Sequence, residues 1–159
     1  MKNQLLLFAA ALVIVACTKP QPVALTNTEE EQIRNEIMEL TTQWAVDNSN
    51  KDADAASEFW ADSPEMCHAE NGIFFTNPDS VYAFLKNFYL NTDTMQVAWT
   101  ERIITPLTSN IALMKGFFHF RAVFKSGDVF EGEPAFTGVF VQKEGKWALL
   151  QGHESFAMH

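Results

Sequence analysis

The apolar residues after Thr28 recur at the spacing of an amphipathic helix. They follow one another at intervals of four, three and four residues from Ile33 to Trp44. This period is that of one helix face, so we expect a helix that runs to about Asp47. Thr28 and Glu31 stand three residues apart, as in a capping box, and predict that the helix begins here.

Two further helices and a hairpin are expected in the next part of the chain. Asp52 is placed to cap a short helix, and Asn77-Pro78 has the cap and first-turn residues of a longer one. Between these helices, Asn71-Gly72 separates two apolar runs, which is the typical sequence of a two-residue hairpin turn.

The second half of the chain is dominated by strand patterns. An antiparallel meander of four strands is predicted at residues 94–104, 110–125, 129–143 and 146–156. Pro134 marks a bend in the third of these strands. Helices first and strands last indicate an α+β fold, with the three helices packed on one face of the sheet. Because residues 110–125 are apolar on both faces, the other face needs a cover, and we expect a homodimer.

The N-terminal segment has the pattern of a targeting signal. An unbroken apolar run at residues 5–16 is too short to span a bilayer as a helix, and it ends in Ile14-Val15-Ala16-Cys17. This run resembles the lipobox of bacterial lipoproteins. The resemblance implies a signal peptide at residues 1–16, lipid on Cys17 and a tether at 17–27.

The resemblance also implies a location for the protein. A lipidated chain would lie in the bacterial cell envelope, anchored to the membrane through Cys17. Position 19 is Lys and not Asp, and in enteric lipoproteins this directs the protein to the outer membrane. The domain would then face the periplasm. Cys67 would then be the one remaining cysteine, which leaves no partner for an intrachain disulfide.

The charge of the chain excludes some partners. Lys and Arg number 11 against 20 Asp and Glu, a formal net charge of −9. Nucleic acid requires a basic surface to neutralise its phosphates, so we expect no nucleic-acid partner. Electrostatic docking on anionic lipid is disfavoured for the same reason.

The order of these elements resembles the NTF2-like superfamily, and within it the SnoaL-like and DUF4440-type domains. The motifs that carry the resemblance are Phe-Trp-Ala-Asp at 59–62 and the closing Gly-Lys-Trp-Ala-Leu-Leu-Gln-Gly-His-Glu-Ser at 145–155. It covers residues 28–156, and we assign 28–159 to this domain. The family fold implies a cone, in which a strongly curved, mainly antiparallel sheet wraps around helices and leaves a pocket at its open end.

Residues of the last strand are candidates for the pocket. The strand period of two places Trp147, Leu149, Gln151, His153 and Ser155 on one face. The family resemblance implies that this face lies inside the cone. His153 is then a candidate base or ligand contact, since its charge can switch near neutral pH, and Gln151 and Ser155 are candidate ligand-binding residues.

A second histidine follows from the resemblance to ketosteroid isomerase, another member of the superfamily. Its pattern, aligned on Asp52, implies that His68 stands in the position of the catalytic base. The position of the oxyanion tyrosine falls on Trp44, whose indole is a donor only. The further aromatic residues expected to line an apolar ligand pocket are Trp60, Tyr82 and Trp99.

Three functions remain open at this point. The first is a cell-envelope lipoprotein whose pocket binds a small apolar or amphipathic molecule. The second is a lyase or isomerase that uses His68 or His153. The third is a dimerisation or assembly domain without a ligand. The four histidines have no short metal-binding spacing and the chain has no glycine-rich phosphate loop, so we expect no metal and no cofactor.

Overall fold

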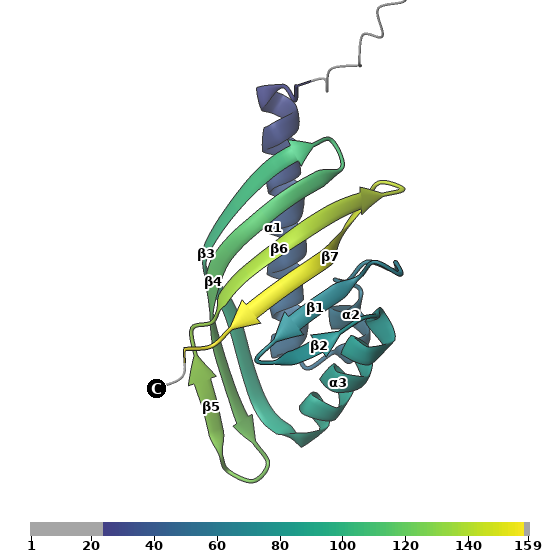
Figure 1. Cartoon of the computed structure of the whole chain (residues 1–159). Helices are drawn as coiled ribbons and strands as arrows, with labels where there is room; N and C mark the ends of the chain where they lie inside the picture. The colour runs from purple at the N-terminus through teal and green to yellow at the C-terminus, as the bar shows by residue number, and fades with distance from the viewer. Residues whose placement is uncertain (1–23, 158–159) are drawn as a thin grey trace, which may run out of the picture.

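The protein is a curved sheet with helices on its inner side (Figure 1). A computed structural model of the chain describes residues 24–157. The helices are α1 (Asn27–Ser49), α2 (Ala53–Ser57) and α3 (Pro78–Asn91). The strands are β1 (Cys67–Glu70), β2 (Ile73–Phe75), β3 (Thr92–Thr108), β4 (Ile111–Phe124), β5 (Val129–Gly132), β6 (Ala135–Lys143) and β7 (Lys146–Ser155).

All strands belong to one sheet, in the order β2-β1-β7-β6-β4-β3, and β5 pairs with β4. Consecutive long strands run antiparallel, as the predicted meander requires. The exception is the short strand β1, which lies between α2 and α3 in the chain and pairs with β7 in parallel. The predicted α+β class is therefore confirmed, and β1 next to β7 is the arrangement that builds the site described below.

The first helix begins two residues earlier than predicted. Thr26 is the N-cap, and the Glu29 backbone N–H donates to its hydroxyl at 3.3 Å. The Glu29 carboxylate in turn accepts from the Thr26 backbone N–H at 2.7 Å, which completes a capping box. The prediction of this box at Thr28 is wrong, because the same spacing of hydroxyl and carboxylate occurs twice. The last residues assigned to the tether thus belong to the helix start, whereas the signal peptide and Cys17 lie outside the described residues.

The hairpin and the third helix form as their sequence motifs predict. Asn71 and Gly72 both have positive φ, 47° and 84°, as a two-residue turn between antiparallel strands requires. The Asn77 side chain accepts from the Ser80 backbone N–H at 2.9 Å and caps α3. The turn and the cap bring β1 and α3 to the same end of the sheet.

A β-bulge in β7 changes which residues face the helices. Gln151 pairs with Val139 and Leu149 pairs with Phe140, so Leu150 has no partner in the register. One extra residue reverses the alternation of the strand beyond it. Leu149 is fully buried on the helix side, and beyond the bulge it is Glu154 that is buried.

The prediction that one face carries Trp147, Leu149, Gln151, His153 and Ser155 is therefore wrong. The first two residues point inward, while the last three lie exposed on the outer face of the sheet. A strict period of two cannot hold across the bulge.

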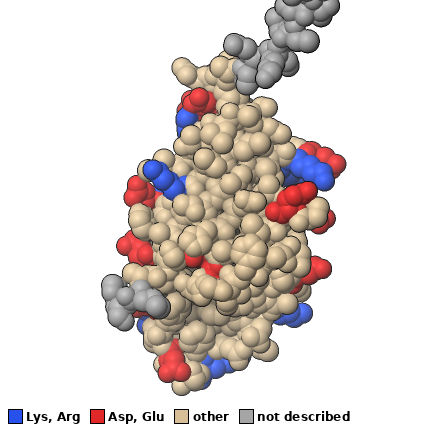
Figure 2. Space-filling model, viewed as in Figure 1, with Lys and Arg blue, Asp and Glu red and all other residues tan. Residues whose placement is uncertain are grey.

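The core lies between α1 and the sheet, where Phe118, Phe140 and Ile37 are fully buried. The outer face of the sheet keeps exposed apolar side chains, among them Leu113 and Phe117. Figure 2 shows that charged side chains gather toward the margins of this view and that its middle is mostly uncharged. Within residues 24–157, no helix has the length and apolar character needed to cross a membrane.

Candidate functional site

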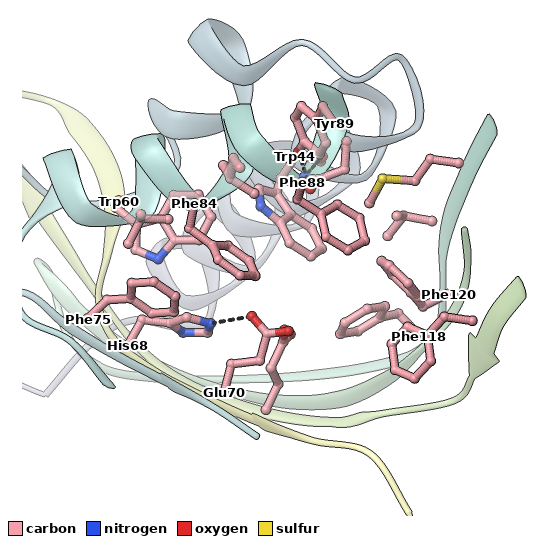
Figure 3. Close-up of a pocket in the computed structure, with 17 residues that line it drawn as sticks. Trp44, Trp60, His68, Glu70, Phe75, Phe84, Phe88, Tyr89, Phe118 and Phe120 are labelled. Atoms are coloured by element: carbon pink, nitrogen blue, oxygen red, sulfur yellow. Dashed lines mark hydrogen bonds and ion pairs between the residues drawn. The ribbon is translucent and has the colours of Figure 1, made fainter. Parts of the chain in front are cut away.

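An aromatic pocket lies where α3, the C-terminal end of α1 and the inner side of the sheet meet (Figure 3). It has a volume of about 60 Å³, which is too small for a long lipid chain. Its apolar walls are Trp44, Trp60, Phe75, Val81, Phe84, Leu85, Phe88, Met95, Val97, Phe118, Phe120 and Phe130. Phe130 of β5 is 38% exposed and stands at the rim.

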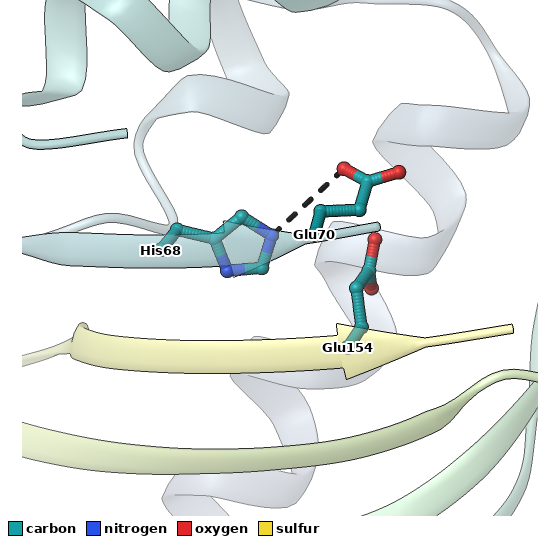
Figure 4. A group of neighbouring side chains, drawn as sticks. All are labelled: His68, Glu70 and Glu154. Atoms are coloured by element: carbon teal, nitrogen blue, oxygen red, sulfur yellow. Dashed lines mark ion pairs between the residues drawn. The ribbon is translucent and has the colours of Figure 1, made fainter. Parts of the chain in front are cut away.

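Three titratable side chains stand on the floor of this pocket: His68, Glu70 and Glu154 (Figure 4). His68 and Glu70 are two residues apart on β1 and share a face by the strand period. Glu70 pairs directly with Glu154 in the parallel register of β1 and β7. The Nε2 atom of His68 lies 4.0 Å from the nearer carboxylate oxygen of Glu70.

Burial separates the protonation states of the two carboxyl groups. Burial raises the pKa of Glu154 well above its usual range, and the adjacent Glu70 raises it further. Burial also raises the pKa of Glu70, whose side chain is 21% exposed and so remains nearer to water. Of the two groups, Glu154 therefore holds its proton more tightly and donates a hydrogen bond to the Glu70 carboxylate.

His68 is neutral in this environment. Burial lowers the pKa of His68 to about 4, with a smaller lowering from His153. Its ring lies between Trp60 and Phe75, at centroid distances of 5.9 and 6.0 Å. A Cβ on Gly152 would lie 2.7 Å from the His68 Nδ1, so only glycine at that position leaves room for the ring.

The opposite wall holds a buried hydrogen-bonded pair. The Tyr89 hydroxyl donates to the Asn48 side-chain oxygen at 2.6 Å, and the Asn48 amide donates to the Trp44 carbonyl at 2.7 Å. Burial, with smaller contributions from the negative charges of Asp47 and Asp52, raises the pKa of Tyr89. The phenol stays protonated, and its proton is held by Asn48.

The same acids and histidine offer the one possible metal site in the described part of the chain. One ligand atom each from His68, Glu70 and Glu154 lie within 4.8 Å of one another. Donors that bind zinc stand about 2 Å from the ion, so they approach one another more closely than the 4.0 Å between His68 and Glu70. The predicted absence of a metal rested on sequence spacing alone, which overlooks this cluster because Glu154 is far from His68 in the chain.

Three of the predicted site residues line the pocket: Trp44, Trp60 and His68. Trp99 does not, because its indole donates to the Thr41 carbonyl at 2.8 Å and the ring packs in the core behind the pocket wall. Tyr82 lies on the outer side of α3, with the Lys86 ammonium 5.4 Å from its ring centroid.

The remaining predictions concerned β7. His153 and Gln151 lie along a shallow groove on the outer face together with Cys67, and Ser155 is exposed on the same face. The structure therefore places His68 and His153 on opposite sides of the sheet, and the expectation that His153 points into the cone is wrong.

Sequence reasoning missed four polar residues of the pocket, namely Asn48, Glu70, Tyr89 and Glu154. Glu70 had a usable signal, since His-x-Glu on a strand places both side chains on one face. Tyr89 also had one, because it continues the buried stripe of α3 four residues after Leu85. Glu154 had none, since the bulge reverses its side.

Comparisons with solved structures indicate the fold. The chain is similar to an NTF2-like superfamily protein from Salmonella enterica serovar Typhimurium, with 15% identity, a TM-score of 0.73, and coverage of 81% of this chain and 94% of that chain. A structure assigned to a scytalone dehydratase from Novosphingobium aromaticivorans has 7% identity, a TM-score of 0.77, and coverage of 84% and 89%. A hexachlorocyclohexane dehydrochlorinase from Novosphingobium barchaimii has 10% identity and a TM-score of 0.72, with coverage of 84% of this chain and 92% of that chain.

These similarities confirm the predicted NTF2-like fold. No curated protein matches the sequence. The model of the SnoaL-like domain matches residues 37–159, which is most of the chain and includes every residue of the pocket. The chain therefore belongs to the SnoaL-like domain family.

Proposed function

We propose that the pocket binds a small, mainly apolar molecule and that His68 removes a proton from it. The chain would thus act as an isomerase or an eliminating lyase on a small ring-shaped substrate. The observation that carries this proposal is the place of His68, whose Nε2 lies 4.0 Å from the Glu70 carboxylate in a pocket lined by aromatic rings.

The reaction needs an unprotonated base. It also needs a negative charge beside that base, which stabilises the positive charge that forms when the base takes the proton. Neutral His68 takes the proton at Nε2, and the electron pair of the broken C–H bond stays on the substrate. The Glu70 carboxylate stabilises the imidazolium ion. In an isomerisation the proton then returns to another carbon of the substrate. In an elimination the electron pair forms a carbon–carbon double bond as the bond to the leaving group breaks, and His68 passes the proton to the departing group.

Two of the similar structures support this class of reaction by their names. A dehydratase removes water and a dehydrochlorinase removes hydrogen chloride, and both are eliminations. The fold alone does not imply a function, so the proposal rests on the arrangement of His68, Glu70 and Glu154 rather than on the similarity.

Proton removal is tested by deuterium exchange in heavy water. The chain is incubated with small ring ketones, such as indanones and cyclohexenones, and deuterium at carbon is followed by NMR. Exchange above the buffer rate supports the proposal. Binding of the same molecules without exchange would instead favour a carrier, and neither binding nor exchange would favour an assembly domain.

We also propose that lipid on Cys17 anchors the chain in the bacterial cell envelope, with the pocket on the periplasmic side of the outer membrane. The support is the run Ile14-Val15-Ala16-Cys17 at the end of an apolar segment. Cys17→Ser is expected to move the protein from the membrane fraction to the soluble fraction of lysed cells. A variant that remains processed and membrane-bound would contradict the anchor.

We further propose that two copies pair through the outer face of the sheet. Ile103, Leu113 and Phe117, all more than 40% exposed, lie along that face. Sedimentation should give twice the monomer mass, and Phe117→Asp should give the monomer because it places a charge in the apolar contact. Val46→Asp, on an exposed apolar residue of α1, is the matched control and should remain a dimer. A wild-type monomer at tens of micromolar would refute the pairing.

A further inference from the structure

His68 is a buried polar side chain without a hydrogen-bond partner among residues 24–157. Its side chain is only 5% exposed, and its Nδ1 atom is buried with no donor or acceptor in reach. The Nε2 atom is turned toward Glu70, but the 4.0 Å between them exceeds a hydrogen bond (Figure 4). A buried polar atom without a partner is unfavourable, so Nε2 is available to a further group.

The two carboxyl groups beside His68 lack a positive side chain that would balance their charge. Glu70 and Glu154 are direct partners in the parallel register of β1 and β7, and Glu154 donates a hydrogen bond to Glu70. Among the described residues that line the pocket, none is lysine or arginine. Two buried carboxyl groups that face each other need either a shared proton or a cation between them.

The separations of the three donor atoms decide which cations fit. One atom each from His68, Glu70 and Glu154 lie within 4.8 Å of one another. In a tetrahedral zinc site all donors stand about 3.3 Å apart, since each lies about 2 Å from the ion. Around a six-coordinate ion with bonds of about 2.1–2.4 Å, neighbouring donors stand about 3 Å apart and opposite donors about 4–5 Å. The 4.0 Å between His68 and Glu70 therefore fits a six-coordinate ion better than zinc.

We propose that His68, Glu70 and Glu154 form a binding site for a six-coordinate divalent transition-metal ion, Mn²⁺ or Fe²⁺. The imidazole nitrogen favours these ions over Mg²⁺ and Ca²⁺, which prefer oxygen ligands. Nε2 and one oxygen of each carboxyl group bind the ion, and the proton shared by the two glutamates leaves to water. The two positive charges of the ion then balance the two carboxylates. The remaining coordination positions face the pocket, which has room for water.

This site goes beyond the proposed function and has a consequence for it. A metal ion and a substrate proton compete for the same electron pair on the His68 Nε2 atom. A bound ion therefore prevents His68 from acting as a base, so the ion inhibits the deuterium exchange proposed above.

The site is tested by titration of the full chain with Mn²⁺ at neutral pH, after removal of other metals with a chelator. Free Mn²⁺ is measured by its electron paramagnetic resonance signal, and we expect one tightly bound ion per chain. Glu154→Gln and His68→Gln each remove one ligand. Each should weaken the binding by at least about tenfold, because the loss of even an outer partner of a metal site has that effect.

The matched control is Glu131→Gln. Glu131 also stands beside a histidine, 3.9 Å from the Nε2 atom of His119, but it is exposed and forms an ion pair with Arg121 at 3.2 Å. This variant should bind Mn²⁺ as the wild type does. Melting temperatures without metal identify the variants that fold, and either of the two ligand variants is sufficient for the comparison.

Three results would overturn the site. These are a wild type without a tight Mn²⁺ site, unchanged affinity in the ligand variants, and displacement of Mn²⁺ by an equal concentration of Ca²⁺, which would mean that His68 is not a ligand. The titration contains no substrate. The metal site can therefore fail while deuterium exchange in the presence of a chelator succeeds, and the reverse is equally distinguishable.

Discussion

His68→Gln is expected to reduce deuterium exchange into a small ring ketone by about 10²–10⁴-fold, the usual contribution of a positioned general base. Glutamine has a similar volume and keeps polar atoms in the pocket, but its amide cannot take a proton near neutral pH. Binding of that ketone should change little, because the aromatic walls of the pocket remain. The exchange rate is measured by NMR alongside the binding constant of the same ketone.

The matched control is His119→Gln. His119 is half-buried on the other side of the sheet, where its Nε2 lies 3.9 Å from Glu131. This variant should exchange deuterium at the wild-type rate. If His68→Gln retains the wild-type rate while it melts at the same temperature, His68 is not the base and the proposed reaction is wrong.

Glu154→Gln is expected to make the protein more stable at pH 8 and to leave its stability near wild type at pH 4. The pKa of Glu154 is raised above its usual 4.5 in the folded protein, so the folded state keeps a proton that the unfolded chain releases. Stability of the wild type is therefore lost as the pH rises above 4.5. Glutamine imitates the protonated acid, still donates to Glu70, and does not titrate.

Melting temperatures of both proteins from pH 4 to pH 8 measure this effect. Glu101→Gln, at an exposed carboxylate, is the control and should show no such gain. A wild type and a Glu154→Gln variant that keep a constant difference across the range would mean that Glu154 is ionised in the fold.

His68 contributes a pH dependence of the opposite sign. Its pKa is lowered from 6.5 to about 4, so the unfolded chain takes up a proton that the folded protein does not. The contribution of His68 to stability is complete above pH 6.5 and is lost as the pH falls toward 4, by about 3 kcal/mol in total. His68→Gln should remove this loss of stability at acid pH and keep the loss at alkaline pH, which comes from the raised pKa values of Glu154 and Glu70.

The helices, the hairpin and the long strands could be predicted from the sequence because their signals are local. Asn77 and Pro78 start α3, Asn71-Gly72 turns the hairpin, and the apolar spacing of α1 defines its buried face. The site could be predicted only where a residue's side follows from its own element. His68 is such a residue, since it stands on a short regular strand.

The rest of the site depends on a β-bulge and a strand pairing that the pattern of apolar and polar residues does not indicate. Leu149 and Leu150 are both apolar, so nothing in the sequence indicates which of them is the bulge, and the inward side of β7 was assigned to His153 rather than Glu154. The parallel pairing of β1 with β7 joins residues more than eighty positions apart. Glu70 and Glu154 become neighbours only through that pairing.

The central claim is that His68 is a neutral base inside a ligand pocket, and NMR titration of its ring nitrogens tests this most directly. The account predicts that His68 is unprotonated from pH 5.5 to 8, gains its proton near pH 4, and changes its ring signals on addition of an indanone while His119 does not respond. A His68 that carries a proton at pH 7, or ring signals that the indanone leaves unchanged at saturation, would contradict it.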